Sequence, residues 1–236
     1  MAHALVLLSY LLGGASLLGF GAFLALGSFQ LMPLGLSPAG ALALDAVLCL
    51  GFFAQHSGMI RRGFRDRLAR VAPAHHHAAI YAVASGVALL VLLAGWQRVD
   101  LVVWSLDGAW RWLPRGLFVL AGVIFWWAVS ALGSFDAFGV KAVRHGARSR
   151  PAATSELRIA GPYRLVRHPI YTSLLICLWA VPTMTVDRLL LAALTSLWLV
   201  VGSRLEERDL VADFGEPYRA YQRRVPMLLP WRGLAD

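Results

Sequence analysis

Long apolar runs separated by short polar segments dominate the chain. A run of about 20 apolar residues is typical of a transmembrane helix, because a helix of that length crosses the hydrocarbon core of a bilayer. The pattern therefore predicts an all-α polytopic membrane protein with six spans. The expected spans are Ala4–Gln30, Pro38–Met59, Ala78–Trp96, Pro114–Ser134, Ile170–Thr185 and Val186–Ser203.

The last two runs are short, and only the charged pair Asp187–Arg188 interrupts the apolar sequence there. We expect these runs to form a tight helical hairpin. The alternative is one long kinked span over the same residues, which would give five spans. The first run lacks a basic start and a clear small-residue cleavage site, so we expect it to be retained and not removed as a signal peptide.

Composition agrees with a membrane protein. Hydrophobic residues make up 58% of the chain and charged residues only 15%, with a mean hydropathy of +0.63, whereas soluble domains average about 25% charged residues. Cys49 and Cys177 fall in different runs, which excludes a disulfide framework. The chain has no internal repeats and no soluble region large enough to fold alone, so we expect a single domain over residues 1–236.

Basic residues cluster between the runs. Three segments, 61–70, 141–167 and 204–232, hold 18 of the 22 Lys and Arg residues, and all three lie on one side of a six-span arrangement. The positive-inside rule assigns that side, and both termini, to the cytoplasm. Topology and anionic headgroups account for the net charge of +9, so we expect no nucleic-acid partner.

One basic segment, GPYRLVRHPIYT at residues 161–172, leads directly into an apolar run. Pro169 suits the first position of a helix, where its missing N–H has no cost. The residue before a proline is extended, so His168 should lie at the mouth of that helix. The free N–H groups there, with Arg164 and Arg167 beside them, favour an anion. The alternative is a membrane-interface anchor.

A second polar segment, residues 203–230, follows the last run. Glu206 and Glu207 are expected at the negative C-terminal end of that helix, where two carboxylates need a cation to compensate them. Arg204 and Arg208 are one possible source, and a cationic ligand is the other. Together the two segments would hold a molecule with a carboxylate at one end and positive charge at the other.

These two segments resemble the signature of the integral-membrane methyltransferases. That superfamily includes isoprenylcysteine carboxyl methyltransferases, phospholipid N-methyltransferases and NnrU-like proteins. The shared pattern is G-P-Y-x-x-x-R-H-P-x-Y followed, one apolar hairpin later, by E-E-x-x-L-x-x-x-F-G-x-x-Y-x-x-Y. The resemblance implies S-adenosylmethionine as methyl donor and S-adenosylhomocysteine as product. It also implies a cofactor-binding region in 135–236, around the helical hairpin 170–203, after four spans in 1–134.

The resemblance also implies roles for individual residues. Arg167 and His168 would face the carboxylate end of the cofactor, and Tyr171 would line its cleft. Glu206 and Glu207 would meet its amino or ribose groups. The full expected set of cofactor-binding residues is Tyr163, Arg167, His168, Pro169, Tyr171, Glu206, Glu207, Tyr218 and Tyr221. Of these, Tyr218 and Tyr221 would close over the cofactor.

A narrower resemblance covers residues 52–231. The stretches FFAQHSGMIRRGF, ALGSFDAFG, LWAVPTMTV and MLLPW are similar to those of bacterial methanethiol S-methyltransferases, which convert methanethiol to dimethyl sulfide. This resemblance implies a small thiol as substrate and a location in the bacterial cytoplasmic membrane, with the active site facing the cytoplasm. His75–His77 and Gly58 depart from that pattern and leave the choice of substrate open.

Methyl transfer from a sulfonium to a thiol is an in-line displacement that needs positioning and a way to lose the thiol proton. His56 is the candidate base, because its ordinary pKa suits proton uptake near neutrality; the alternative is a histidine hydrogen-bonded to a neighbouring helix. Asp136 is a second catalytic candidate, with a helix cap or a salt bridge as the alternative, and Arg164 is the third. We expect no metal site, since consecutive histidines such as His75–His77 rarely converge on one ion.

Two other functions remain open. One is methylation of a lipid or isoprenylcysteine acceptor that enters between helices from the bilayer. The other is a membrane protein without enzymatic activity, such as an NnrU-like factor or a transporter, although transporters typically show broken helices or paired repeats. We make no prediction of the oligomeric state.

Overall fold

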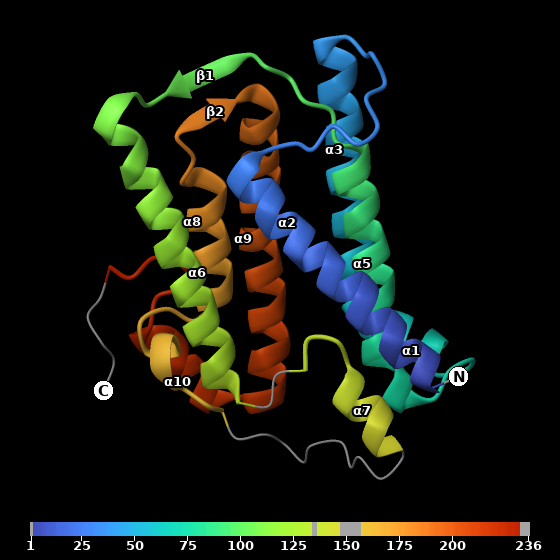
Figure 1. Cartoon of the computed structure of the whole chain (residues 1–236). Helices are drawn as coiled ribbons and strands as arrows, with labels where there is room; N and C mark the ends of the chain where they lie inside the picture. Colours follow the sequence, from blue (N-terminus) through green and yellow to red (C-terminus); the bar gives the residue numbers. More distant parts are fainter. Residues whose placement is uncertain (1, 134–135, 147–156, 232–236) are drawn as a thin grey trace. The chain divides into compact units, whose positions relative to one another are not determined.

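The computed structural model is mainly helical and describes residues 2–133, 136–146 and 157–231 (Figure 1). Ser134, Arg148, Arg150 and Arg232, which enter the predictions above, lie outside the described residues. The helices and strands follow in the order α1 Ala2–Leu8, η1 Ser9–Gly13, α2 Gly14–Leu26, α3 Pro38–Ile60, α4 Arg62–Leu68, η2 Ala74–His76, α5 His77–Gly95, β1 Val102–Ser105, η3 Gly108–Arg111, α6 Trp112–Leu132, α7 Val140–His145, η5 Gly161–Arg164, α8 Pro169–Trp179, β2 Thr183–Thr185, α9 Val186–Phe214 and α10 Glu216–Arg224.

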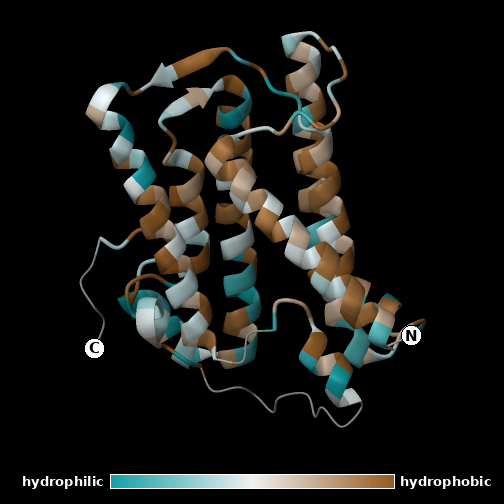
Figure 2. Ribbon diagram, viewed as in Figure 1, coloured by the Kyte–Doolittle hydropathy of each residue, from teal (hydrophilic) through white to brown (hydrophobic). Residues whose placement is uncertain are grey.

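Five helical segments in the described part of the chain are long and apolar enough to cross a membrane. They are Ala2–Leu26, Pro38–Ile60, Ala74–Gly95, Gly108–Leu132 and Val186–Phe214, and Figure 2 shows their predominantly hydrophobic colouring. The predicted class, an all-α polytopic membrane protein, is confirmed. Its boundaries follow local chemistry; for example, the Ser37 side chain accepts a hydrogen bond from the Gly40 N–H and caps α3, which has Pro38 in its first turn.

The fifth predicted span is wrong in its length. Helix α8 ends at Trp179 after 11 residues, which corresponds to about 16 Å, too short for a hydrocarbon core of about 30 Å. Pro182 explains the early end, because a proline disfavours helical conformation at the preceding residue. The chain continues as a connection that contains β2 and leads into α9.

The sixth predicted span begins at Val186 as expected but does not end at Ser203. Helix α9 runs for 29 residues to Phe214 and stops at Gly215, whose φ is +64°. Asp187 and Arg188 lie in its first turn and not in the hairpin connection. Because α8 and α9 are separate helices lying side by side (Figure 1), the predicted hairpin is confirmed and the single kinked span is wrong. The described residues nevertheless contain five candidate spans, the number given by the alternative, because α8 is too short to count as a sixth.

The chain divides into two compact units. The first contains residues 1–100 and 136–153. Its spans are the continuous helix α1–η1–α2, α3 and α5. Gly86 of α5 packs tightly against this first helix, since a Cβ at Gly86 would lie only 2.8 Å from the backbone of Leu12.

The second unit contains residues 101–135 and 154–236, with helices α6, α8, α9 and α10. Strands β1 and β2 form an antiparallel pair in which Val102 faces Thr185 and Ser105 faces Thr183. This pair joins the beginning of α9 to the segment that precedes α6, while α10 lies at the opposite end of α9 (Figure 1).

Candidate active site

The GPYRLVRHPIYT segment belongs to the second unit and turns sharply before it enters α8. Gly161 has a φ of +56°, which favours glycine, and a Cβ there would lie 3.0 Å from the indole nitrogen of Trp127 in α6, so a larger residue would also be crowded. Residues 161–164 form the short helix η5. His168 then occupies the N-cap position of α8 and Pro169 its first turn, as predicted.

The segment Val225–Leu228, which follows α10, binds the entrance of α8 through its backbone. The N–H groups of Arg167 and His168 donate to the carbonyls of Pro226 and Met227 at 2.9 and 3.1 Å. The Thr172 hydroxyl donates to the Leu228 carbonyl at 2.7 Å. These contacts hold both side chains of the Arg-His pair in place from outside their own helix.

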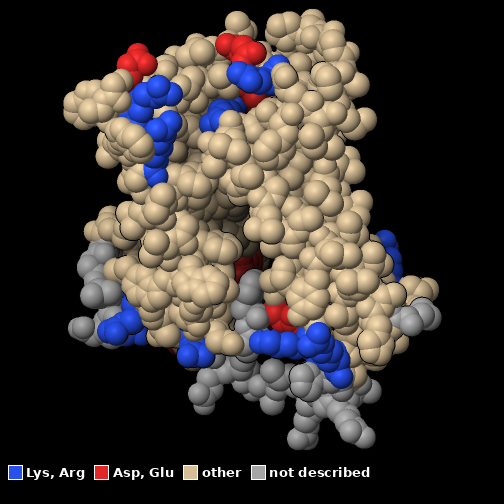
Figure 3. All heavy atoms as spheres, in the orientation of Figure 1, with Lys and Arg blue, Asp and Glu red and all other residues tan. Residues whose placement is uncertain are grey.

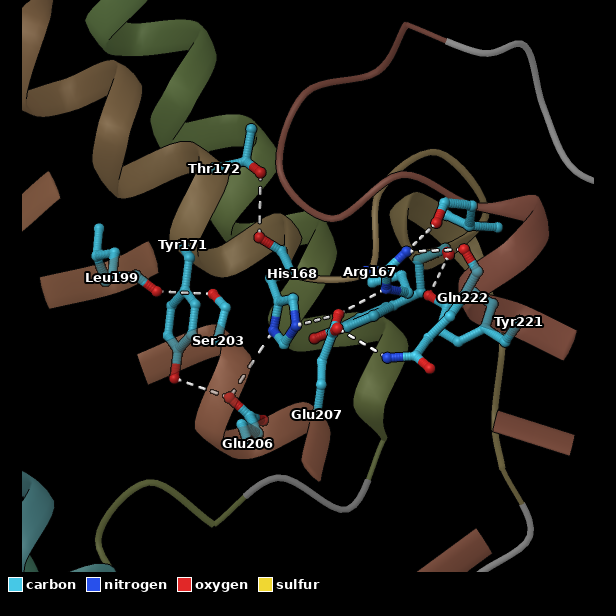
Figure 4. A network of polar contacts seen from close by, with 12 residues as sticks. Arg167, His168, Tyr171, Thr172, Leu199, Ser203, Glu206, Glu207, Tyr221 and Gln222 are labelled. Atoms are coloured by element: carbon cyan, nitrogen blue, oxygen red, sulfur yellow. Dashed lines mark hydrogen bonds and ion pairs between the residues drawn. The ribbon is translucent and has the colours of Figure 1, made fainter. Parts of the chain in front are cut away.

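Glu207 of α9 is the centre of a buried ionic network (Figure 4). Its Oε1 accepts from Arg167 Nε at 2.6 Å and lies 3.1 Å from His168 Nε2, while its Oε2 accepts from Gln222 Nε2 at 2.8 Å. The Arg167 guanidinium also donates through Nη1 to the carbonyls of Gln222 and Val225. Three elements, α8, α9 and α10, are therefore joined through one carboxylate.

Glu206, the adjacent residue, is in a different position. Its side chain is 48% exposed, and its Oε2 accepts from the Tyr171 hydroxyl at 3.0 Å. His168 Nδ1 lies 3.8 Å from the same oxygen, and the His168 and Tyr171 rings stack with centroids 5.4 Å apart. Because a carboxylate only accepts, His168 Nε2 carries a hydrogen, which it donates to Glu207 Oε1.

The sequence predicts both glutamates at the negative C-terminal end of a helix, and the structure shows that this placement is wrong. Glu207 does not lie at the end of its helix, since α9 continues for seven residues to Phe214, and the helix dipole acts only within the last turn. Glu207 is compensated instead by Arg167, with a hydrogen bond from His168, and both residues come directly before α8. The two motifs that were expected at opposite ends of a ligand contact each other.

Three tyrosines of the predicted site are packed around α10. Tyr218 and Tyr221 are buried in a cluster with Val225, and the Tyr221 hydroxyl donates to the Tyr163 carbonyl at 2.6 Å. Burial, and secondarily the Glu206 carboxylate, raise the pKa of Tyr163 to about 12. Burial likewise raises the pKa of Tyr218 and Tyr221. All three phenols are therefore neutral donors at physiological pH.

His56 and Asp136 belong to the first unit. The Tyr81 hydroxyl of α5 lies 2.8 Å from His56 Nε2, which is the neighbouring-helix contact given as the alternative for His56. Asp136 accepts from the backbone N–H groups of Val140 and Lys141 at 3.1 and 2.7 Å, so it caps α7. Arg164, the third catalytic candidate, lies in η5 of the second unit with an exposed side chain.

Sequence reasoning did not select one residue of this network, Gln222. Gln222 contributes both its side chain and its carbonyl to the Glu207 network, but nothing in its sequence neighbourhood distinguishes it from the other polar residues of α10. Among the described residues, no group of three or more His, Cys, Asp or Glu could hold a metal ion.

Comparison with known proteins identifies the family of the chain. The family model described as NnrU protein matches residues 45–230. A methanethiol S-methyltransferase of Pseudomonas sp. (strain GM41(2012)) is 38% identical over 81% of this chain and 74% of its own length. One of Mycobacterium tuberculosis is 34% identical over 83% and 81%.

A vertebrate protein is similar as well: nurim of Sus scrofa is 33% identical over 72% of this chain and 68% of its own length. No solved structure matches the chain. Arg167, His168, Glu206 and Glu207 all lie inside the matched residues 45–230. On this similarity, which covers most of its length, the chain belongs to the NnrU family, together with methanethiol S-methyltransferases.

Proposed function

We propose that this protein transfers a methyl group from S-adenosylmethionine to a small thiol, converting methanethiol to dimethyl sulfide. The observation that carries the proposal is the 38% identity, over 81% of the chain, to an enzyme named methanethiol S-methyltransferase. The sequence motifs that imply S-adenosylmethionine coincide with the polar network of the second unit.

The described residues fit such a cofactor at Glu206. Its half-exposed carboxylate accepts from the Tyr171 hydroxyl and lies 3.8 Å from His168 Nδ1, and an accessible carboxylate binds cationic and hydroxyl groups through charge-assisted hydrogen bonds. Glu206 would hold the amino group or ribose hydroxyls, while the exposed Arg164 and the Tyr163 phenol would serve the remaining polar and aromatic parts. When bound, S-adenosylmethionine supplies a methyl group on a sulfonium.

Glu207 has a different proposed role. Arg167, His168 and Gln222 already occupy both of its oxygens, so it acts as a positioning residue. By accepting from His168 Nε2, Glu207 holds the imidazole with Nδ1 directed toward Glu206. Arg167 and Gln222 hold Glu207 in turn. Preorganisation of this kind matters because small misplacements of a reacting group are costly in rate.

A thiol acceptor must lose its proton, since an alkyl thiol has a pKa near or above that of free cysteine, about 8.5, and is mostly protonated near neutrality. We propose His56 as the proton acceptor, with Tyr81 as its hydrogen-bond partner. The test is kcat against pH with saturating methanethiol. The rate deficit of His56→Ala, about 10²–10⁴-fold for loss of a general base, should shrink as pH rises; parallel profiles would show that His56 is structural.

The proposed location is the bacterial cytoplasmic membrane, with Glu206 and Glu207 on the cytoplasmic side. The excess of basic residues in the segments on that side supports it. A cysteine introduced at Ala212, an exposed position of α9, should resist a membrane-impermeant thiol reagent in intact cells and react after lysis. Reaction in intact cells would reverse the assigned orientation.

The proposed activity is tested with purified protein, isotopically labelled S-adenosylmethionine and a panel of acceptors. The panel contains methanethiol, hydrogen sulfide, isoprenylcysteine and phosphatidylethanolamine. We expect label in dimethyl sulfide and none in the lipid acceptors. Glu206→Ala should abolish most of the signal, whereas Asp45→Asn in the first unit should retain it. Label in isoprenylcysteine or phosphatidylethanolamine alone, or in no product, would overturn the proposed substrate.

A further inference from the structure

Residues 101–115 of the second unit, which contain β1 and the first turn of α6, form a largely apolar segment, which we call the β1 segment. All four residues of β1 are exposed, and three of them are Val102, Val103 and Trp104. Trp110 and Trp112 are even more exposed, at 72% and 68%. Exposed apolar patches of this kind mark a surface that meets another apolar phase and not bulk water.

The backbone of the same segment is not compatible with a position in the hydrocarbon core of the bilayer. Within the described residues β1 pairs with β2 alone, in a two-stranded sheet with an irregularity between Val102 and Trp104. A two-stranded sheet leaves one edge of each strand without a ladder partner. Open strand edges do not occur in lipid hydrocarbon, where unsatisfied backbone groups cost several kcal/mol. The side chains therefore disfavour water, and the backbone disfavours the bilayer centre.

The length of α9 gives the distance between the β1–β2 pair and Glu207. Val186 directly follows β2, and Glu207 lies 21 residues further along the same helix, or about 31 Å at 1.5 Å per residue. The hydrocarbon core is about 30 Å thick. Residues 189–203 between these points contain no Asp, Glu, Lys or Arg. When the Glu207 end lies at one headgroup layer, the β1–β2 pair lies at the other.

The polar side chains of the segment suit a headgroup layer. The Arg115 guanidinium lies 4.9 Å from the ring centroid of Trp112, and Arg111 is placed four residues earlier, on the same side of the beginning of α6. In Figure 3 basic side chains gather over this region, at the upper left. Tryptophan prefers the membrane–water interface, and arginine binds phosphate in a bidentate manner.

We infer that residues 101–115 bind the phospholipid headgroup layer opposite the Glu206–Glu207 end of α9. In this position the Val and Trp side chains insert at the level of the lipid carbonyls, and Arg111 and Arg115 bind lipid phosphate. Water and headgroups satisfy the open edge of β1. The segment then anchors α6, α8 and α9 at a fixed depth in the bilayer. Helix α8 alone is too short to fix that depth.

Spin labels measure that depth. The labels are attached to Val103→Cys, to Val119→Cys in α6 and to Ala212→Cys in α9, in a Cys49→Ser/Cys177→Ser background. The protein is reconstituted in phosphatidylethanolamine–phosphatidylglycerol vesicles, and collision with oxygen is compared with collision with a water-soluble nickel chelate. We expect Val103 to lie between the aqueous Ala212 and the deep Val119. A value equal to Ala212 or to Val119 would overturn the inference.

A second measurement avoids the introduced cysteines. The difference in tryptophan fluorescence between the wild type and Trp110→Phe reports on Trp110 alone. This difference should be quenched most by lipids brominated near the carbonyl and least by lipids brominated near the chain end. Quenching that is strongest at the chain end, or absent at every position, would contradict the interfacial location.

A third measurement returns to the spin label at Val103→Cys. The double variant Arg111→Gln/Arg115→Gln should increase nickel access to this label. Unchanged access would exclude phosphate binding by these arginines.

Discussion

In the first unit, buried polar side chains join neighbouring elements in small groups, whereas in the second unit they form a charged network. Asp45 of α3 is fully buried and accepts from the Gln97 N–H at 2.8 Å. The Gln97 side chain in turn binds the backbone of Met32, Leu34 and Gly95. Every polar atom of that side chain is thus used to connect segments of the same unit.

In the second unit, two adjacent glutamates differ in their partners and in their exposure. Glu207 is saturated by three side chains, but Glu206 beside it keeps nearly half of its surface exposed. Figure 2 shows that this occurs where α9 changes from hydrophobic to hydrophilic. The difference indicates that the buried Asp45–Gln97 group serves stability, while the second unit leaves one carboxylate of its polar network accessible.

The largest expected effect follows from Glu207→Ala. This change leaves the Arg167 guanidinium, whose side chain is only 10% exposed, without its carboxylate. Removing one partner of a buried ion pair costs about 3–5 kcal/mol. We expect a strongly lowered apparent Tm and proteolysis of α10 in detergent-purified protein. Glu206→Ala is the matched control and should leave the Tm nearly unchanged; equal Tm values for both variants would remove the distinction between the two carboxylates.

The second effect concerns ligand affinity and depends on the proposed function. Glu206→Ala should weaken S-adenosylmethionine binding by about ten- to a hundred-fold, because loss of a hydrogen bond to a charged group costs about 1.5–3 kcal/mol. Isothermal calorimetry measures the change. Arg208→Ala, an exposed residue of the same helix, serves as the control. Wild-type affinity in Glu206→Ala would exclude this carboxylate as a cofactor contact.

A comparable change in the first unit should affect stability alone. Asp45→Ala leaves the Gln97 N–H without its acceptor at a buried site, which costs about 1–3 kcal/mol. Asp45→Asn keeps an acceptor oxygen and should recover much of that loss. Chemical denaturation measures the stability and calorimetry the cofactor affinity. A reduced affinity in folded Asp45→Asn protein would assign Asp45 a role beyond structure.

Tyrosine ionisation affects the stability of the second unit at high pH. The folded pKa of Tyr163, about 12, exceeds its ordinary value of 10, so the folded state retains the proton longer than the unfolded state. This contribution to stability is complete below pH 10 and is lost as pH rises toward 12. Tyr163→Phe should flatten that decline. Ultraviolet titration at the phenolate band, together with the Tm at each pH, tests it; a Tyr163 that ionises near pH 10 would contradict the prediction.

The smallest expected effect is that of Thr172→Val. The Thr172 hydroxyl donates to the Leu228 carbonyl at 2.7 Å, and a neutral hydrogen bond contributes about 0.5–1.5 kcal/mol. The Tm should fall slightly and amide hydrogen exchange of Val225–Leu228 should accelerate. The control is Ser196→Ala, a substitution in α9 away from this segment. It should leave the hydrogen-exchange rate of this segment unchanged. Acceleration in both variants would indicate a general loss of stability.

Sequence patterns predicted most of the helical boundaries. Pro38 and Pro169 begin helices where expected, because proline at the first turn and the residues before it are governed by local sterics. The length of α9 was missed, since hydropathy reports where the apolar surface ends and not where the helix ends. Leucine, glutamate and arginine favour helix, and the chain continues helical until Gly215.

Long-range pairing was beyond sequence reasoning. Glu207 lies 40 residues from Arg167 and 15 from Gln222, and no local pattern relates their side chains. The pairing of β1 with β2 was missed for the same reason, because each strand has only three or four residues. Residue chemistry correctly indicated a cation beside Glu207, although not for the reason of a helix end, and the three-dimensional fold determines that this cation is Arg167.

The binding of Val225–Leu228 to the entrance of α8 has a consequence for how the protein is made. The ribosome produces Arg167 and His168 well before Val225, so their backbone N–H groups have no Pro226 or Met227 carbonyl to bind during that interval. The membrane helices can insert in order as they emerge. The Arg-His pair, in contrast, reaches its final geometry only after α10 and the residues behind it have been synthesised, so assembly of the site is the last step in the biogenesis of this unit.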